Sequence, residues 1–210
     1  MIKKLLDKLT SAAEEEQKIV LIDPAALGAG KPEPDLRIIG MFCDVHEEKV
    51  AEVIHAMLYL NEMNKLEKDS KERLPIEFYL STYGGSADDM FSIYDMMNLV
   101  KETCEIHTNA LGKVMSAGVL LLAAGTKGKR KIGANCRIML HSCNAGNVGD
   151  IHNLQNEMEA ISDLQDKFIA ALVAETSLTK KQLKKLLDRK VNVYLTAQEA
   201  IEYGIVDEII

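Results

Sequence analysis

The sequence predicts one α/β domain with a largely parallel sheet, and two observations lead to this fold class. First, 47% of the 210 residues are hydrophobic, which is enough to fill one core. Second, short apolar runs typical of buried strands alternate with longer amphipathic segments typical of helices. Parallel strands need crossover connections, and the alternating helices supply them.

Besides the strand NVYLTA from Asn192, five segments are predicted as strands, because each is a short run dominated by apolar residues. They are RIIGMF from Arg37, IEFYLS from Ile76, CEIHTNAL from Cys104, CRIMLHS from Cys136 and IVDEII from Ile205.

Helices are predicted between these strands from apolar residues at i, i+3 and i+4, and from capping pairs three residues apart. The pairs are Asp44 with Glu47, Ser86 with Asp89, Thr179 with Gln182 and Thr196 with Glu199. Residues 116–124 are so apolar that they predict a buried helix, which Gly125 ends. A long helix is predicted over 151–174, and a solvated loop over the charged residues 64–75.

Residues 1–36 are predicted to form an N-terminal arm and linker, with the body of the protein over residues 37–210. The linker, residues 24–36, holds three of the four prolines. The chain begins with a basic amphipathic stretch, but Asp7 and the acidic run 14–16 argue against a transit peptide. The longest wholly apolar run, 119–124, is too short to cross a membrane.

Charge and cysteine content narrow the classes of ligand. The net charge is −7, and no long basic cluster offsets it, so we expect no nucleic acid partner. The four cysteines form no CxxC pair, which predicts reduced thiols in a cytoplasmic compartment and neither a disulfide framework nor a zinc site. We also expect no membrane partner, no metal and no cofactor.

Two strand-to-helix turns are candidates for chemistry, because backbone N–H groups at a helix start lack partners within the helix. One turn contains Gly84, Gly85 and Ser86, and the other contains Ser116, Ala117 and Gly118. Ser116 suits two interpretations, either a nucleophile or a small residue that packs or caps the helix. The spacing of its glycines is not that of the GxSxG nucleophile elbow.

A serine nucleophile requires a base, and His141 is the best placed of the five histidines. It ends the predicted strand RIMLH and begins a loop of small and polar residues. A histidine at a strand end also suits a purely structural role. His46, His55 and His152 lie at or within amphipathic helices and are predicted to be surface or boundary residues.

Taken in order, three stretches resemble the family of the Clp protease proteolytic subunit (ClpP), a self-compartmentalising serine peptidase. They are TYGGSADDMFSIYDMM, SAGVLLLAAGTKGKRKIGANCRIMLH and TAQEAIEYGIVDEI, and the resemblance spans about residues 37–210. It implies a layered ClpP/crotonase-like α/β fold with a long handle helix. It further implies a homo-oligomer of two stacked heptameric rings, a tetradecamer that receives unfolded polypeptides from an AAA+ unfoldase.

By this resemblance Ser116 matches the nucleophile and His141 the general base, while the N–H groups of Gly85 and Ala117 match the oxyanion hole. The third triad residue departs from the family pattern. Counting back from Ala197 reaches Asn192 where the family has Asp, and Asp188 is the nearest carboxylate. We favour Asn192, because the predicted strand NVYLTA, residues 192–197, should keep its register with the following helix. An amide orients a histidine without stabilising its charge, which predicts a slow or conditionally active peptidase.

Other readings remain open. The chain could be a non-catalytic ring subunit that supports an active partner, as Asn192 allows, or a crotonase-type acyl-CoA enzyme, although that family does not use a Ser–His pair.

Phe78 and Tyr79 lie on the strand that in ClpP contributes aromatic residues to unfoldase docking, and ordinary burial in the core is the alternative. The N-terminal arm and the long loop 61–74 also depart from the family.

Overall fold

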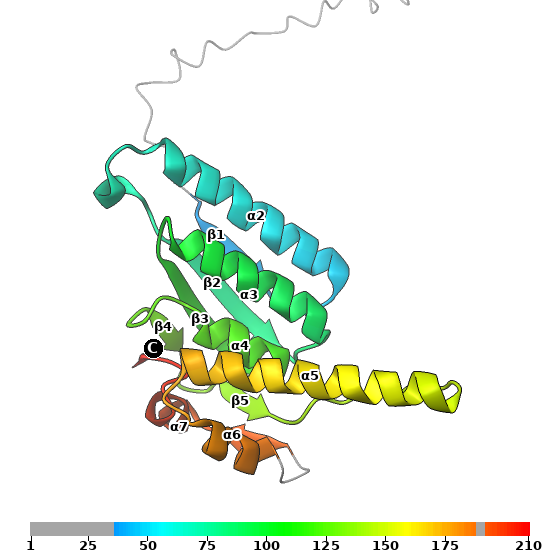
Figure 1. Cartoon of the computed structure of the whole chain (residues 1–210). Coiled ribbons are helices and arrows are strands. Elements are labelled where there is room, and N and C mark those ends of the chain that lie inside the picture. The colour runs from blue at the N-terminus through cyan, green and yellow to red at the C-terminus, as the bar shows by residue number, and fades with distance from the viewer. Residues whose placement is uncertain (1–35, 188–191) are drawn as a thin grey trace, which may run out of the picture. The chain divides into compact units, whose positions relative to one another are not determined.

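A sheet of seven strands forms the centre of the part of the chain that the structure, a computed structural model, describes, namely residues 36–187 and 192–210. The strands are β1 (Ile38–Met41), β2 (Ile76–Thr82), β3 (Ile106–Met115), β4 (Arg130–Ile132), β5 (Arg137–Leu140), β6 (Val193–Leu195) and β7 (Glu208–Ile209). All pair in parallel except β5 with β6 (Figure 1). The predicted α/β class with a largely parallel sheet is confirmed.

The helices lie between the strands in sequence, as the crossover connections of a parallel sheet require. They are α2 (Glu47–Leu66), α3 (Ala87–Lys101), α4 (Ala117–Ala123), α5 (Ile151–Glu175), α6 (Lys180–Leu187) and α7 (Ala197–Glu202), with a short 3-10 turn, η2 (Ser70–Glu72).

Strand β3 changes partner along its length, and this change brings β5 into the sheet. Residues 108–110 pair with β4, whereas residues 113–115 pair with β5. Gly112 lies between the two halves with φ of +66°, a backbone conformation that disfavours other residue types. Because β2, the second half of β3, and β5 run in parallel, their carboxyl ends meet at one edge of the sheet.

The core is deepest around α4, whose seven residues are all buried. This explains why its sequence is apolar on every side, unlike that of a surface helix. The burial of helix α5 changes along its length (Figure 1). Phe168, Ile169 and Leu172 in its second half are buried, whereas Ile151 and Met158 in its first half are 72% and 69% exposed.

Most predicted helix starts are confirmed. The side chain of Ser86 accepts a hydrogen bond from the N–H of Asp89, and Thr196 with Glu199 forms a complete capping box. Thr179 and Gln182 bond each other in the same way at the start of α6. The Asp44 cap is wrong, because α2 begins at Glu47 and its cap position, His46, makes no side-chain capping bond.

Two further features differ from the prediction. The sequence predicts no strand at β4, which is only three residues long and carries two basic residues. Helix α2 continues to Leu66, into the expected loop, because Asn64 is buried and bonded in its last turn. The Asn64 amide oxygen accepts from Arg37 at 2.8 Å and from the Leu74 N–H at 3.2 Å. Of the two residues considered for docking, Phe78 is fully buried in the core, which agrees with the alternative of ordinary burial, and Tyr79 is partly buried.

A buried arginine, paired with an aspartate near the surface, holds the carboxyl end of α5 against the sheet. Arg130 is 4% exposed and bonds both carboxylate oxygens of Asp207, at 2.6 and 2.8 Å. The same guanidinium donates to the Glu175 carbonyl at 2.8 Å. Burial would raise the pKa of Asp207, but its hydrogen bonds with Arg130 outweigh this, so the pKa lies below its ordinary value.

We predict that Asp207→Ala lowers the free energy of unfolding by about 3 kcal/mol, because it leaves the Arg130 charge buried and unpaired. The control, Glu208→Ala, removes a surface pair 3.9 Å long with Lys131 and should cost less than about 1 kcal/mol. Chemical denaturation measures both.

The same ion pair predicts a dependence of stability on pH. Because the pKa of Asp207 is depressed, the contribution of Asp207 to the free energy of unfolding is present above the ordinary value of 3.8 and is lost as pH falls below it. The variant should therefore lose less stability than the wild type on acidification through this range, and equal losses would contradict the prediction.

Candidate active site

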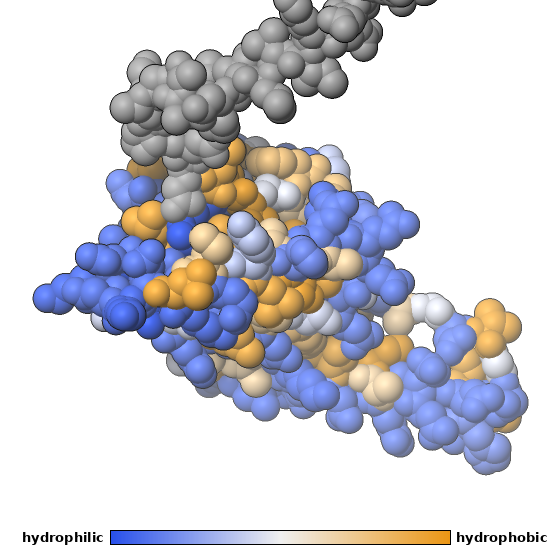
Figure 2. Space-filling model, turned by 90° about the horizontal axis from the view of Figure 1, so that it is seen from above, coloured by the Kyte–Doolittle hydropathy of each residue, from blue (hydrophilic) through white to orange (hydrophobic). Residues whose placement is uncertain are grey.

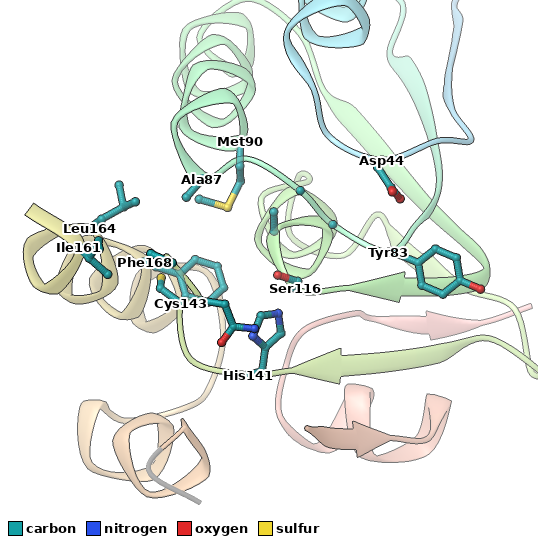
Figure 3. Close-up of a pocket in the computed structure, with 15 residues that line it drawn as sticks. Asp44, Tyr83, Ala87, Met90, Ser116, His141, Cys143, Ile161, Leu164 and Phe168 are labelled. Atoms are coloured by element: carbon teal, nitrogen blue, oxygen red, sulfur yellow. The ribbon is translucent and has the colours of Figure 1, made fainter. Parts of the chain in front are cut away.

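The carboxyl ends of β2, β3 and β5 open onto one pocket of about 400 Å³ (Figure 3). Ligands of parallel α/β sheets bind at this edge, where the loops that follow neighbouring strands diverge. Five of the candidate site residues chosen from the sequence line the pocket together, namely Gly84, Gly85, Ser116, Ala117 and His141.

Ser116 has a strained backbone. Its φ of +54° and ψ of −123° make it the only non-glycine residue with positive φ in the described part of the chain. Such conformations cost of order 1–3 kcal/mol and gather at functional sites. Its N–H donates to the Met139 carbonyl at 2.8 Å, which ties it to β5. Its hydroxyl makes no capping bond, so the capping interpretation fails and the side chain stays available at the pocket.

The glycine turn after β2 lies directly against Ser116. A Cβ on Gly84 would lie 2.6 Å from the Ser116 Cβ and 3.1 Å from the Ala117 nitrogen. A Cβ on Gly85 would overlap the carbonyl oxygen of Val45. The two turns can therefore pack together only because residue 84 lacks a side chain, and the absence of one at residue 85 lets the same turn lie against Val45.

Two backbone donors remain unused at this contact. Within residues 36–187 and 192–210, the N–H groups of Gly85 and Ala117 have no protein acceptor. Both residues line the pocket beside Ser116. A pair of free N–H groups next to a potential nucleophile is the arrangement that stabilises an oxyanion.

His141 is held by a hydrogen bond from its Nδ1 to the Ser142 carbonyl oxygen at 2.6 Å. A carbonyl only accepts, so Nδ1 must carry the proton, which leaves Nε2 of the neutral ring as a proton acceptor. The imidazole lies in the pocket near Ser116 (Figure 3), but no hydrogen bond joins the two side chains in the described structure.

Asn192 immediately precedes β6, and His141 immediately follows β5. The antiparallel β5–β6 pairing ends where Leu140 faces Val193, one residue short of both. Asn192 is nevertheless exposed, and within the described residues no hydrogen bond joins its side chain to His141. The alternative, Asp188, lies outside the described residues.

One wall of the pocket is apolar and was not identified as part of a site from the sequence. Met90 of α3 and Ile161, Leu164 and Phe168 of α5 form it. All four carry the helical periodicity of a buried face, which does not distinguish a core from a pocket. Asp44 and Tyr83 lie toward the opposite side of Ser116 (Figure 3).

Cys143 also lines the pocket, but its thiol is a poor competitor for Ser116 as nucleophile. Burial raises the pKa of the Cys143 thiol above its ordinary value, which keeps the reactive thiolate scarce near neutral pH. All four cysteines are free thiols.

The other histidines lie elsewhere. His46, His55 and His152 are exposed, as predicted, and His107 bonds the carboxylates of Glu77 and Glu105. No group of three or more His, Cys, Asp or Glu side chains in the described ranges is arranged to hold a metal ion. No helix among those described is long and apolar enough to span a membrane.

The fold and the pocket define an α/β protein with a serine, a histidine and two free backbone N–H groups at the carboxyl edge of its sheet. The Clp protease family model matches residues 34–210. The chain therefore belongs to the Clp protease family.

Two curated relatives agree with this assignment. The ATP-dependent Clp protease proteolytic subunit 4 of Rhodococcus jostii is 35% identical over 164 residues, which cover 78% of this chain and 79% of the relative. The proteolytic subunit 1 of Rhodopirellula baltica is 29% identical over 174 residues, which cover 83% and 72%.

Proposed function

We propose that the protein is a ClpP-like serine endopeptidase that cleaves unfolded polypeptides. The observation that supports this most is the strained Ser116, whose hydroxyl is free of capping and faces a pocket shared with His141. A packing serine would need neither the strain nor the histidine. Membership of the Clp protease family is consistent with the same role.

In the proposed reaction, Ser116 Oγ attacks the peptide carbonyl carbon while His141 Nε2 takes the hydroxyl proton. The N–H groups of Gly85 and Ala117 bind the oxyanion of the tetrahedral intermediate. The C–N bond then breaks, and the imidazolium returns its proton to the leaving amine. Water, deprotonated by His141, hydrolyses the acyl-enzyme and regenerates Ser116. The apolar wall of Met90, Ile161, Leu164 and Phe168 would accept an apolar substrate side chain beside the scissile bond.

We predict that a fluorophosphonate probe labels Ser116, as intact mass and peptide mapping can measure. Ser116→Ala should abolish labelling, and His141→Ala should slow it by about a thousandfold, because the general base is lost. The matched control His152→Ala changes an exposed histidine and should label at the wild-type rate. Absence of labelling in the wild type, with or without a partner ATPase, would instead favour a non-catalytic ring subunit.

Conditional activity is part of the proposal, with Asn192 as the third triad residue. Its place supports this, because Asn192 and His141 each lie one residue beyond the Leu140–Val193 pair that ends the β5–β6 pairing. The missing hydrogen bond between their side chains is consistent with low activity at rest. An asparagine in this position provides no negative charge to stabilise the imidazolium that forms during acylation.

Asn192→Asp is expected to raise peptide hydrolysis at least about tenfold, because a carboxylate adds that charge stabilisation. Asp188→Ala should leave hydrolysis unchanged. Steady-state cleavage of a fluorogenic peptide measures both. A loss of activity in Asp188→Ala, with no gain in Asn192→Asp, would assign the third position to Asp188.

We also propose that the subunits assemble into two stacked heptameric rings that receive substrate from an AAA+ unfoldase. The first half of α5 supports an interface between copies of the chain. Ile151 and Met158 of this helix are 72% and 69% exposed, and Val148 just before it is 97% exposed. Figure 2 shows several hydrophobic residues among hydrophilic ones on the part of the molecule that projects to the right. Apolar patches of this kind mark protein interfaces. An extended peptide, which the pocket could bind, requires prior unfolding of folded substrates.

Met158→Asp should convert the double ring to single rings or smaller species, because a charge is then buried in the interface. Sedimentation velocity measures the change. Asn156→Asp introduces the same side chain at a polar position of α5 and should leave the double ring intact. A wild-type protein that sediments as a monomer, or an unchanged Met158→Asp species, would contradict the stacking proposal.

A further inference from the structure

The peptide group between Ser142 and Cys143 is hydrogen bonded on both sides. Its carbonyl oxygen accepts from His141 Nδ1 at 2.6 Å, and its N–H donates to Gln165 Oε1 at 2.9 Å. Gln165 lies in the middle of α5 and is partly buried, 22 residues beyond Cys143. One peptide plane thus connects the long helix to the histidine of the pocket.

The orientation of this peptide determines which nitrogen of His141 carries the proton. In a trans peptide the C=O and N–H point in opposite directions, and the described chain has no cis bonds. The observed orientation directs an acceptor at Nδ1, so Nδ1 must be protonated. If the peptide rotated, it would direct its N–H at Nδ1, and the proton would have to move to Nε2. A protonated Nε2 on a neutral ring cannot accept the Ser116 proton.

We infer that Gln165 is a positioning residue that holds this peptide in the orientation required for His141 to act as a base. The Gln165 Oε1 stabilises the peptide orientation in which the Cys143 N–H faces α5 and the Ser142 carbonyl faces His141. The two bonds share one peptide group, so each polarises the other and strengthens it. This inference rests on the proposed function of His141, and it specifies how α5 controls that site.

The donor and the acceptor can each be removed. Gln165→Leu has similar volume and no acceptor, whereas Gln165→Glu keeps an acceptor and provides no donor when ionised. Cys143→Pro removes the backbone N–H that donates to Gln165 Oε1. Gln198→Leu makes the same replacement at an exposed position of α7 and serves as the control.

The tautomer of His141 is the direct readout, and solid-state ¹⁵N NMR of sedimented, histidine-labelled protein measures it above neutral pH. The His141 signal is assigned by its loss in His141→Ala. We expect the Nδ1–H tautomer in the wild type, in Gln165→Glu and in Gln198→Leu. We expect a mixture with the Nε2–H tautomer in Gln165→Leu. An Nε2–H wild type, or a Gln165→Leu spectrum identical to that of the wild type in correctly assembled protein, would overturn the inference.

Fluorophosphonate labelling gives the functional readout. Gln165→Leu should slow labelling of Ser116 by about fivefold, the effect of one ordinary hydrogen bond, and Gln165→Glu should restore the rate. In a Cys143→Pro background, Gln165→Leu should cause no further change, because the bond is already absent. An additive loss in the double variant would assign Gln165 a different role. If the wild type is never labelled, the peptidase proposal fails, while the NMR result still decides whether Gln165 sets the tautomer.

Discussion

The close packing of two backbone turns is the constraint on which the rest of the site depends. The turn at Gly84 and Gly85 lies so near the Ser116–Ala117 peptide that side chains at either glycine would collide with it or with Val45. Gly118 extends the same contact, because a Cβ there would lie 2.5 Å from Thr82 Cγ2. This packing places two unused N–H groups beside Ser116 and keeps its backbone in a strained conformation. The buried helix α4 holds the strain in place, since all of its residues are packed in the core.

Helix α5 links three parts of the molecule that are far apart in sequence. Its carboxyl end is held by the Glu175 carbonyl on Arg130, which also bonds Asp207 near the end of the chain. Its middle contributes Ile161, Leu164 and Phe168 to the pocket and Gln165 to the Cys143 N–H. Its first half presents apolar side chains to the surface. A movement of this helix would therefore displace both the apolar wall of the pocket and the peptide that orients His141.

The histidine is oriented by a backbone carbonyl, and this distinguishes the resting site from a complete triad. The Ser142 carbonyl fixes the tautomer of His141, which is one of the two tasks of a triad carboxylate. It supplies only a dipole and no full charge, so in the proposed mechanism the second task, stabilising the imidazolium, would be left to Asn192. The geometry thus agrees with a base that is correctly protonated but weakly supported.

The sequence alone determined the features that depend on neighbouring residues. Capping pairs such as Ser86 with Asp89 are local, and strands followed by turns identified Gly85, Ser116 and His141. The family resemblance combined these residues into one site, and the shared pocket agrees with that combination. Tertiary structure decided what depends on contacts between distant segments. The extension of α2 follows from the bonds that Asn64 makes with Arg37 and Leu74, and the short β4 exists because β3 and β7 pair with it. The bond between Gln165 and Cys143 joins residues on different elements, and no local pattern encodes it, because its energy arises only when the folded chain brings the helix and the loop together.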